Sequence, residues 1–341
     1  MKTNLLKCIP FFLGLLVSSL AGFSQEPTSP LFQKKEVLQI KIEANMKALL
    51  RDRGEKPIYH WGKLSYIDEQ SNTIEMPIKV KVRGNFRRLT ENCDFPPLLI
   101  DFQQKKENKT VFQRQNKLKL VTKCQMDDYV FQEYLVYEIY NLITDLSFKA
   151  RLVEVTYVDS LGKRKPETDY GFFIEDENDI AKRNAAKIHA GANIPMAISD
   201  TILMATVAIF EYMIGNNDWS VIGKHNIKQY TKPNQLFLPV PYDFDHAGIV
   251  DASYALPPPQ LEISSVRERL YRGLNYSPEV FKQVFDKYNR LKPQIYALYE
   301  GNSLLNPKYV KRTLKYLDEF YEDINDPNAI KKHFIGGRTK N

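Results

Sequence analysis

Three carboxylates and one amide in the second half of the chain could serve phosphoryl transfer or bind a divalent cation. Asp218 follows two asparagines, and Asn226 comes shortly after it. Asp243 and Asp245 lie on either side of Phe244. Residues two apart in an extended chain point to the same side, so these two carboxylates repel one another unless something positive lies between them. A divalent ion that prefers oxygen ligands, such as Mg²⁺ or Mn²⁺, would satisfy this arrangement.

A site that handles phosphate also needs a cation, and an acidic side chain that holds the cation in place. Lys117 and Lys119 alternate with apolar residues, so both lie on the polar face of a short expected strand. The helix expected at about 127–145 carries Glu133 and Glu138 as candidate partners. Lysines and glutamates of this kind are also common on solvated strand and helix surfaces. The pattern therefore leaves both the functional and the surface interpretation open.

The elements that would position these side chains form a strand-rich first half and a helical second half. The most apolar stretch, at 197–214, contains two acidic residues and therefore predicts a buried helix rather than a membrane span. Glu175 ends a hairpin strand, where a hinge between two lobes would present its backbone to an adenine ring. The order of elements predicts an α+β fold. Alternation and turn residues place the strands at 77–83, 97–102, 117–121, 151–158, 168–174, 226–230 and 236–239, with further helices from about 277.

The N-terminal residues 1–24 have the three parts of a secretory signal: a basic start, a short apolar run and small residues before Gln25. About a dozen apolar residues are too few to span a bilayer as a helix. We therefore expect cleavage, no stable membrane insertion afterwards, and a periplasmic or secreted protein with a flexible lead-in at 25–35. Cleavage removes Cys8, and the remaining pair, Cys93 and Cys124, is expected to form a disulfide in an oxidising compartment.

The net charge of +7 is modest and is not concentrated in one helix or tail. This distribution disfavours a nucleic-acid-binding protein, because such proteins usually carry a basic stripe or patch. A mild basic surplus is compatible with an anionic ligand such as a nucleotide or a cell-surface polymer.

Several short motifs, taken in order, resemble the secreted atypical kinases of the spore-coat CotH type. The similarity covers roughly residues 78–250. The resembling segments are Val82-Arg83-Gly84-Asn85, Gly171-Phe172-Phe173-Ile174-Glu175, Asn216-Asn217-Asp218, His225-Asn226 and Tyr242-Asp243-Phe244-Asp245.

The resemblance implies an ATP-dependent, protein-kinase-like fold with a strand-rich N-lobe containing one helix at 36–176, a helical C-lobe at 177–330 and a tail at 331–341. It implies a nucleotide bound with Mg²⁺ or Mn²⁺ and phosphate transfer to an extracytoplasmic protein. Two features depart from ordinary kinases: the glycine-rich GxGxxG loop is absent, and Asp218 and Asn226 are further apart than in the usual catalytic loop. The implied roles are Asp218 as the catalytic carboxylate, Asn226, Asp243 and Asp245 as metal ligands, and Arg83, Lys117, Lys119, Glu133 and Glu175 as nucleotide-binding residues.

Two other functions fit the same residues. The first is a catalytically silent relative that serves as a binding or structural surface protein. The second is a metal-dependent phosphoesterase that uses Asp243, Asp245, His246 and His225 without ATP.

Overall fold

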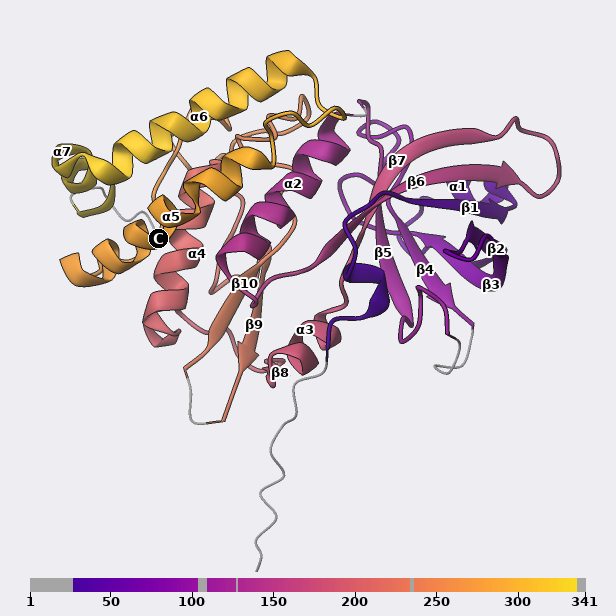
Figure 1. The fold of residues 1–341 in the computed structure, drawn as a ribbon, viewed down its shortest axis with the longest axis horizontal. Coiled ribbons are helices and arrows are strands. Elements are labelled where there is room, and N and C mark those ends of the chain that lie inside the picture. The colour runs from indigo at the N-terminus through magenta and orange to yellow at the C-terminus, as the bar shows by residue number, and fades with distance from the viewer. Residues whose placement is uncertain (1–26, 104–108, 127, 234–235, 336–341) are drawn as a thin grey trace, which may run out of the picture.

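The computed structural model describes residues 27–103, 109–126, 128–233 and 236–335. The expected signal at 1–24, the start of the lead-in and the end of the tail lie outside the described residues. A group of strands stands beside a group of helices, and the chain enters the strands first (Figure 1). The expectation of an α+β fold is therefore confirmed.

The strands of the first half close into a barrel, a feature that the sequence did not predict. Neighbouring strands follow the order β1-β2-β3-β4-β5-β7-β6, and β1 completes the ring by pairing in parallel with β6. The remaining pairs are antiparallel. Closure removes the unpaired edges that an open sheet would expose. The strands are β1 (Leu38–Ala44), β2 (His60–Ile67), β3 (Thr73–Val82), β4 (Leu98–Phe102), β5 (Lys117–Thr122), β6 (Ala150–Asp159) and β7 (Glu167–Ile174).

The alternating sequence of β5 determines which side chains fill the barrel and which face outward. Leu118 and Leu120 belong to the barrel core, whereas Lys119 and Val121 lie on the outer face of the strand. The chain before β1 also packs here, because Leu31 and Phe32 are buried in the same core. The flexible lead-in expected at 25–35 is therefore packed at these two residues, which are apolar enough to fill the barrel.

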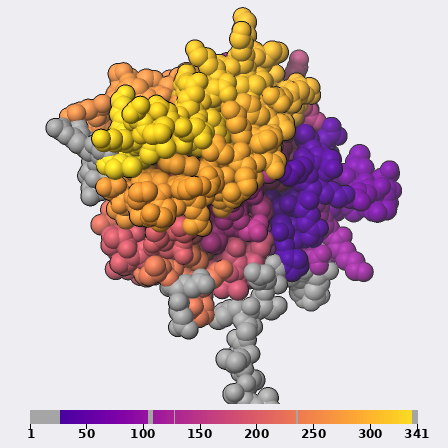
Figure 2. Space-filling model, turned by 60° about the vertical axis from the view of Figure 1, so that its left-hand side comes forward, coloured from indigo at the N-terminus to yellow at the C-terminus, as the bar shows by residue number. Residues whose placement is uncertain are grey.

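The second half consists of helices and one small sheet. The sheet has the order β10-β9-β8, and all its pairs are antiparallel. Helices α5 and α6 cover one face of this half (Figure 2). Within the residues that the structure describes, no helix is both long and apolar enough to cross a membrane. The elements outside the barrel are α1 (Met46–Arg51), α2 (Asp128–Ile143), α3 (Glu177–Arg183), β8 (Lys187–Ile188), α4 (Thr201–Ile214), β9 (Ile227–Thr231), β10 (Leu238–Pro241), α5 (Pro278–Ala297), α6 (Pro307–Asn325) and α7 (Pro327–Ile330), with short turns at Pro30–Phe32, Met196–Ile198 and Lys331–Ile335.

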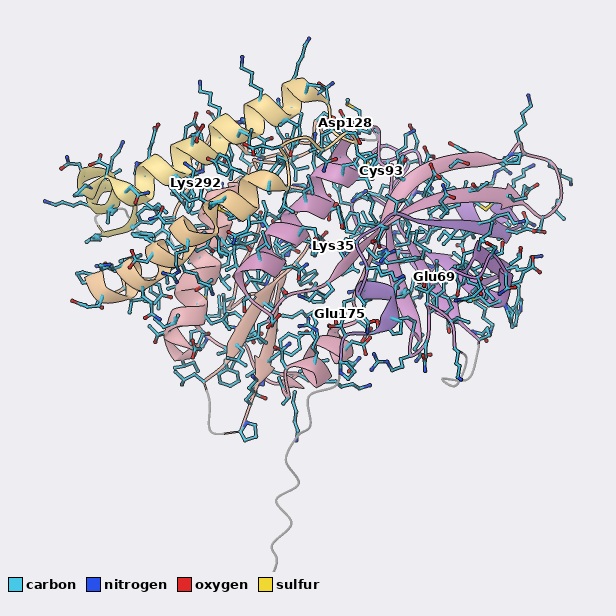
Figure 3. All side chains as sticks on the ribbon, in the orientation of Figure 1. Lys35, Glu69, Cys93, Asp128, Glu175 and Lys292 are labelled. Atoms are coloured by element: carbon cyan, nitrogen blue, oxygen red, sulfur yellow. A yellow bond between two sulfur atoms is a disulfide. The ribbon has the colours of Figure 1, made fainter. Side chains whose placement is uncertain are left out.

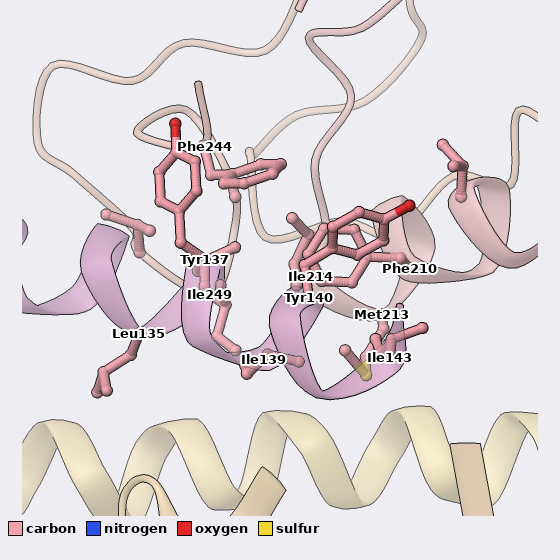
Figure 4. Close-up of a cluster of buried hydrophobic side chains, with 14 of the residues drawn as sticks. Leu135, Tyr137, Ile139, Tyr140, Ile143, Phe210, Met213, Ile214, Phe244 and Ile249 are labelled. Atoms are coloured by element: carbon pink, nitrogen blue, oxygen red, sulfur yellow. The ribbon is translucent and has the colours of Figure 1, made fainter. Parts of the chain in front are cut away.

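Helix α2 shares its core with the helical half, although it follows β5 in the chain. The Tyr137 ring packs against Phe244 with their centroids 4.8 Å apart, and Tyr140 packs against Phe210 at 4.5 Å (Figure 4). The helix is buried almost all round, and its two glutamates, Glu133 and Glu138, are only 2% and 5% exposed. The surface interpretation of these glutamates is therefore wrong.

The expected disulfide joins the β3–β4 connection to the end of β5. Cys93 and Cys124 are bonded, with their Cα atoms 4.9 Å apart, and both side chains are buried. Figure 3 labels Cys93 where the barrel approaches α2. The bond restrains the chain that follows β3, and this segment forms one wall of the candidate site.

Candidate functional site

A cleft of about 390 Å³ opens between the barrel and the helical half. Its walls come from the loop after β3, the outer face of β5, the loop after α4 and the loop after β10. This cleft brings together six residues that the sequence proposed for a single site, although they lie far apart in the chain: Arg83, Lys119, Asp218, Asn226, Asp243 and Asp245.

Hydrogen bonds fix Asp218 at the turn that follows α4. The helix ends at Gly215, whose φ of +68° favours glycine, and an added Cβ would lie 2.1 Å from the Tyr316 hydroxyl. The His225 Nε2 lies 2.8 Å from one Asp218 carboxylate oxygen, and Asn226 Nδ2 lies 3.2 Å from the other. Because Asn226 Nδ2 also donates to the Asp218 carbonyl at 2.8 Å, the three side chains form one positioned unit.

Two of the expected metal ligands have a left-handed backbone conformation that is uncommon outside glycine. The φ angles are +52° at Asn226 and +66° at Asp243. The surrounding structure holds them there. The Asp243 amide donates to the Tyr137 hydroxyl at 2.9 Å, and the Tyr242 amide donates to the Asn226 carbonyl at 3.0 Å. Backbone strain that is maintained by tertiary contacts concentrates at functional sites.

The two acids around Phe244 have different environments. Asp245 is 7% exposed, and its Oδ2 accepts a hydrogen bond from the Tyr254 hydroxyl at 3.2 Å. Asp243 is enclosed between the two halves of the molecule, yet its side chain remains open to water through the cleft. This enclosure, followed by the Asp245 carboxylate, raises the pKa of Asp243. Asp243 is therefore the acid of the pair that a ligand in the cleft can reach.

The sequence interpretation missed Arg87, which is the buried cation of this site. Its Nη1 lies 3.2 Å from Glu133 Oε2 and 3.9 Å from Asp245 Oδ2, and its Nη2 donates to the Thr122 carbonyl at 2.6 Å. Burial alone would lower the pKa of Arg87, but Tyr254, Glu133 and Asp245 together raise it, so the guanidinium stays charged. In the sequence, nothing distinguishes Arg87 from the adjacent arginine.

The ion pair between Arg87 and Glu133 corrects the expectation that a lysine of β5 pairs with an acid of α2. Glu133 contacts Arg87 rather than Lys119. Burial, followed by the Asp245 carboxylate, raises the pKa of Glu133 above the usual value, while Arg87 opposes the shift. Glu138, the other candidate partner, forms an ion pair with Lys35 instead.

Arg83 and Lys119 form a cationic wall on the barrel side of the cleft. Neither cation forms an ion pair within 4.0 Å with a carboxylate of the described part of the chain. Lys119 Nζ lies 5.8 Å from the centroid of the Tyr242 ring. Burial, followed by the charges of Arg83 and Lys228, lowers the pKa of Lys119. An anionic ligand in the cleft would relieve this repulsion between like charges.

Besides Glu133, two more residues expected to bind nucleotide do not line the cleft. Lys117 is exposed near the start of β5 and is not among the cleft residues. Glu175, labelled in Figure 3 between the barrel and α3, is 1% exposed. Its carboxylate accepts from Arg183 Nη2 at 2.9 Å and from the Lys149 amide at 3.0 Å, and its own amide donates to the Lys149 carbonyl at 2.9 Å. The Glu175 amide therefore already donates a hydrogen bond within the protein, and an adenine would have to bind a different backbone group.

The protein side chains alone do not form a complete metal centre. Over the described ranges, no group of three or more His, Cys, Asp or Glu side chains is arranged to hold a metal ion. The residues that fit a hard cation are Asp243 and the Oδ1 of Asn226, whose Nδ2 is directed to Asp218. Mg²⁺ commonly takes one or two protein ligands together with phosphate oxygens and water. This donor set therefore suits an ion that arrives with a nucleotide.

The cleft carries charges of both signs, which suits such a ligand. The carboxylates of Glu133, Asp243 and Asp245 act on the buried Arg87 guanidinium. The cleft lining adds two further cations, Arg83 and Lys119, which form no ion pair with a carboxylate among the described residues. The carboxylates attract a divalent cation, and the cations attract phosphate oxygens.

A comparison with protein-family models and with curated protein sequences finds no match to this chain.

Proposed function

We propose that this chain is an exported, CotH-like kinase with a two-lobed, kinase-like fold. It binds ATP with Mg²⁺ or Mn²⁺ in the cleft and transfers phosphate to an extracytoplasmic protein. The observation that carries the proposal is the convergence of Arg83, Lys119, Asp218, Asn226 and Asp243 on one cleft, which therefore offers both cations and acids to a ligand.

In the proposed reaction, Asp243 and Asn226 Oδ1 would hold the divalent ion, which would neutralise negative charge on the nucleotide phosphates, and Arg83 and Lys119 would contact phosphate oxygens. Asp218 accepts the proton of the acceptor hydroxyl while that oxygen bonds to the γ-phosphorus. The bond from phosphorus to the bridging oxygen breaks, and ADP leaves with the electron pair. The His225 and Asn226 contacts at 2.8 and 3.2 Å orient the Asp218 carboxylate, which still has lone pairs for the acceptor.

Two substitutions separate nucleotide binding from transfer. Asp243→Ala removes a ligand of the ion, so metal-dependent ATP binding should fall. Asp218→Ala should leave ATP binding nearly unchanged and depress transfer, because its contact with the acceptor matters mainly in the transition state. The measurements are calorimetric ATP binding with Mn²⁺, autophosphorylation, and labelled phosphate transfer to an extracytoplasmic extract.

Lys117→Ala provides a matched control, because Lys117 lies outside the cleft on the same strand face as Lys119. Lys119→Ala should weaken ATP binding, and Lys117→Ala should not. Wild-type protein that binds no nucleotide with any divalent ion would end the kinase proposal.

A second candidate is the catalytically silent relative, and the position of Arg87 favours it. The guanidinium lies 3.9 Å from Asp245 and supplies a positive charge inside the acidic cluster. Because the guanidinium already offsets the negative charge of Asp245, this carboxylate needs no metal ion as a counter-charge. ATP binding without autophosphorylation or transfer to any extract would support this candidate over the active kinase.

Export is part of the proposal and has its own test. N-terminal sequencing of the protein recovered from the periplasm or the medium should give a chain beginning near Gln25. Recovery of an intact N-terminus on a membrane-bound product would contradict export by cleavage.

A further inference from the structure

A second cavity, of about 300 Å³, lies on the other side of the segment that carries Asp218. Its lining is mainly apolar and combines the residues after Asp218 with the short turn at Met196–Ile198 and with Arg272 and Leu274. This volume is at the lower end of the range for ligand pockets, roughly 300–1,000 Å³. It suits one or two side chains better than another nucleotide.

The turn at 220–225 separates this cavity from the cleft. Ser220 and His225 pair through two backbone hydrogen bonds, of 2.9 and 3.0 Å, which close the turn. Val221 and Ile222 line the apolar cavity, whereas His225 lines the cleft. A molecule seated in the cavity would therefore lie next to the carboxylate proposed to receive the acceptor proton.

Hydrogen bonds between its walls hold the cavity in shape. The buried Gln229 Nε2 donates to the carbonyls of Ile194 and Val221, both at 3.1 Å, and so joins the two sides. Arg272 Nη1 donates to the carbonyls of Asn217 and Trp219 at 2.8 and 2.7 Å, on either side of Asp218. Arg272 therefore both lines the cavity and restrains the backbone on either side of Asp218.

We propose that this apolar cavity receives an apolar side chain of the acceptor protein, close in sequence to the hydroxyl that is phosphorylated. The inference rests on the proposed kinase function and deepens it by naming the acceptor class. Consecutive Cα atoms are about 3.8 Å apart, so Asp218 and Ile222 are separated by at most roughly 15 Å. An extended peptide covers this distance in about four residues. The preferred acceptor therefore has an aromatic or aliphatic residue within about four positions of its Ser, Thr or Tyr.

The tryptophans of the chain allow a test that does not depend on catalysis. The chain has two, and Trp219 lines the cavity, whereas Trp61 is 64% exposed on the barrel. In a Trp61→Phe background, the emission therefore reports on Trp219 alone. The probes are two synthetic peptides that contain one Ser and differ at one position, three residues away, which is Phe in one and Glu in the other. We expect a saturable change in Trp219 emission with the Phe peptide and about tenfold weaker binding of the Glu peptide.

Two exposed isoleucines provide a matched pair of variants in this background. Ile222 is 58% exposed and lines the cavity, whereas Ile198 is 44% exposed on the neighbouring turn and does not line it. Ile222→Glu should weaken binding of the Phe peptide by about tenfold, and Ile198→Glu should leave it unchanged. Neither change removes a buried side chain, so both variants should fold.

Calorimetric ATP binding with Mn²⁺, measured on the same proteins, separates this inference from the proposed function. ATP binding together with equal affinity for the two peptides would overturn the cavity assignment and leave the kinase proposal standing. Selective binding of the Phe peptide without any ATP binding would overturn the kinase function and leave a peptide-binding cavity. An equal loss of Phe-peptide binding in the Ile222 and Ile198 variants would also overturn the assignment.

Discussion

Replacing Arg87 with methionine should destabilise the protein strongly, because it leaves buried carboxylates without a counter-charge. The Arg87, Glu133 and Asp245 side chains are 10%, 2% and 10% exposed. With an effective dielectric constant of about 20, Coulomb attraction is roughly 5 kcal/mol at the 3.2 Å contact and roughly 4 kcal/mol at the 3.9 Å contact. Desolvation offsets part of this, and removing one partner of a buried pair typically costs about 3–5 kcal/mol. We expect a loss of that size in the free energy of unfolding.

The loss should depend on pH in a defined direction. The pKa of Glu133 is raised in the folded protein, so its protonation favours folding, and its stabilising contribution falls as pH rises. Without Arg87 this pKa should rise further. The variant should therefore lose less stability at about pH 5 than at about pH 8. Urea unfolding at both pH values measures the difference.

Two further proteins complete the test. Arg88→Met is the matched control, because the Arg88 guanidinium donates to the Gly54 carbonyl and has no carboxylate partner in the described part of the chain; we expect a loss of about 1 kcal/mol. Adding Glu133→Gln to Arg87→Met should recover part of the lost stability, since it removes an unpaired buried charge. Equal losses for the two arginine variants, or no recovery in the double variant, would refute this account of Arg87.

Three other substitutions test separate features. Replacing both Cys93 and Cys124 with serine should lower the free energy of unfolding by about 3–4 kcal/mol, as estimated for a loop with a sequence separation of 31 and measured by urea unfolding. Because the pKa of Asp243 is raised, Mn²⁺-dependent ATP binding should weaken between neutral pH and about pH 5, and calorimetry should find this trend reduced in Asp243→Asn. Gly84→Ala should cost about 1–2 kcal/mol in thermal or urea unfolding, because Gly84 has a φ of +88° while the space around it is open.

The sequence alone was sufficient to predict the local features of the site, such as the face of a strand that a side chain occupies. Alternation around Lys119 correctly placed this side chain on the outer face of its strand, because successive side chains of a strand point to opposite sides. The disulfide between Cys93 and Cys124 was predicted from the cysteine count, because only these two cysteines follow the expected signal. The polar turn after the apolar helix and the acidic pair beyond it also marked segments that meet in the cleft.

Only the tertiary structure decided which charges meet. Periodicity gives the face of an element that a residue occupies, but not its partner on another element. Glu133 contacts Arg87 rather than Lys119 because α2 packs into the helical core and turns its glutamate toward the loop after β3. Glu175 likewise contacts Arg183 of α3, a partner that the alternation of its own strand does not indicate. Closure of the barrel likewise depends on β1 meeting β6 across more than a hundred residues, a contact that no local pattern encodes.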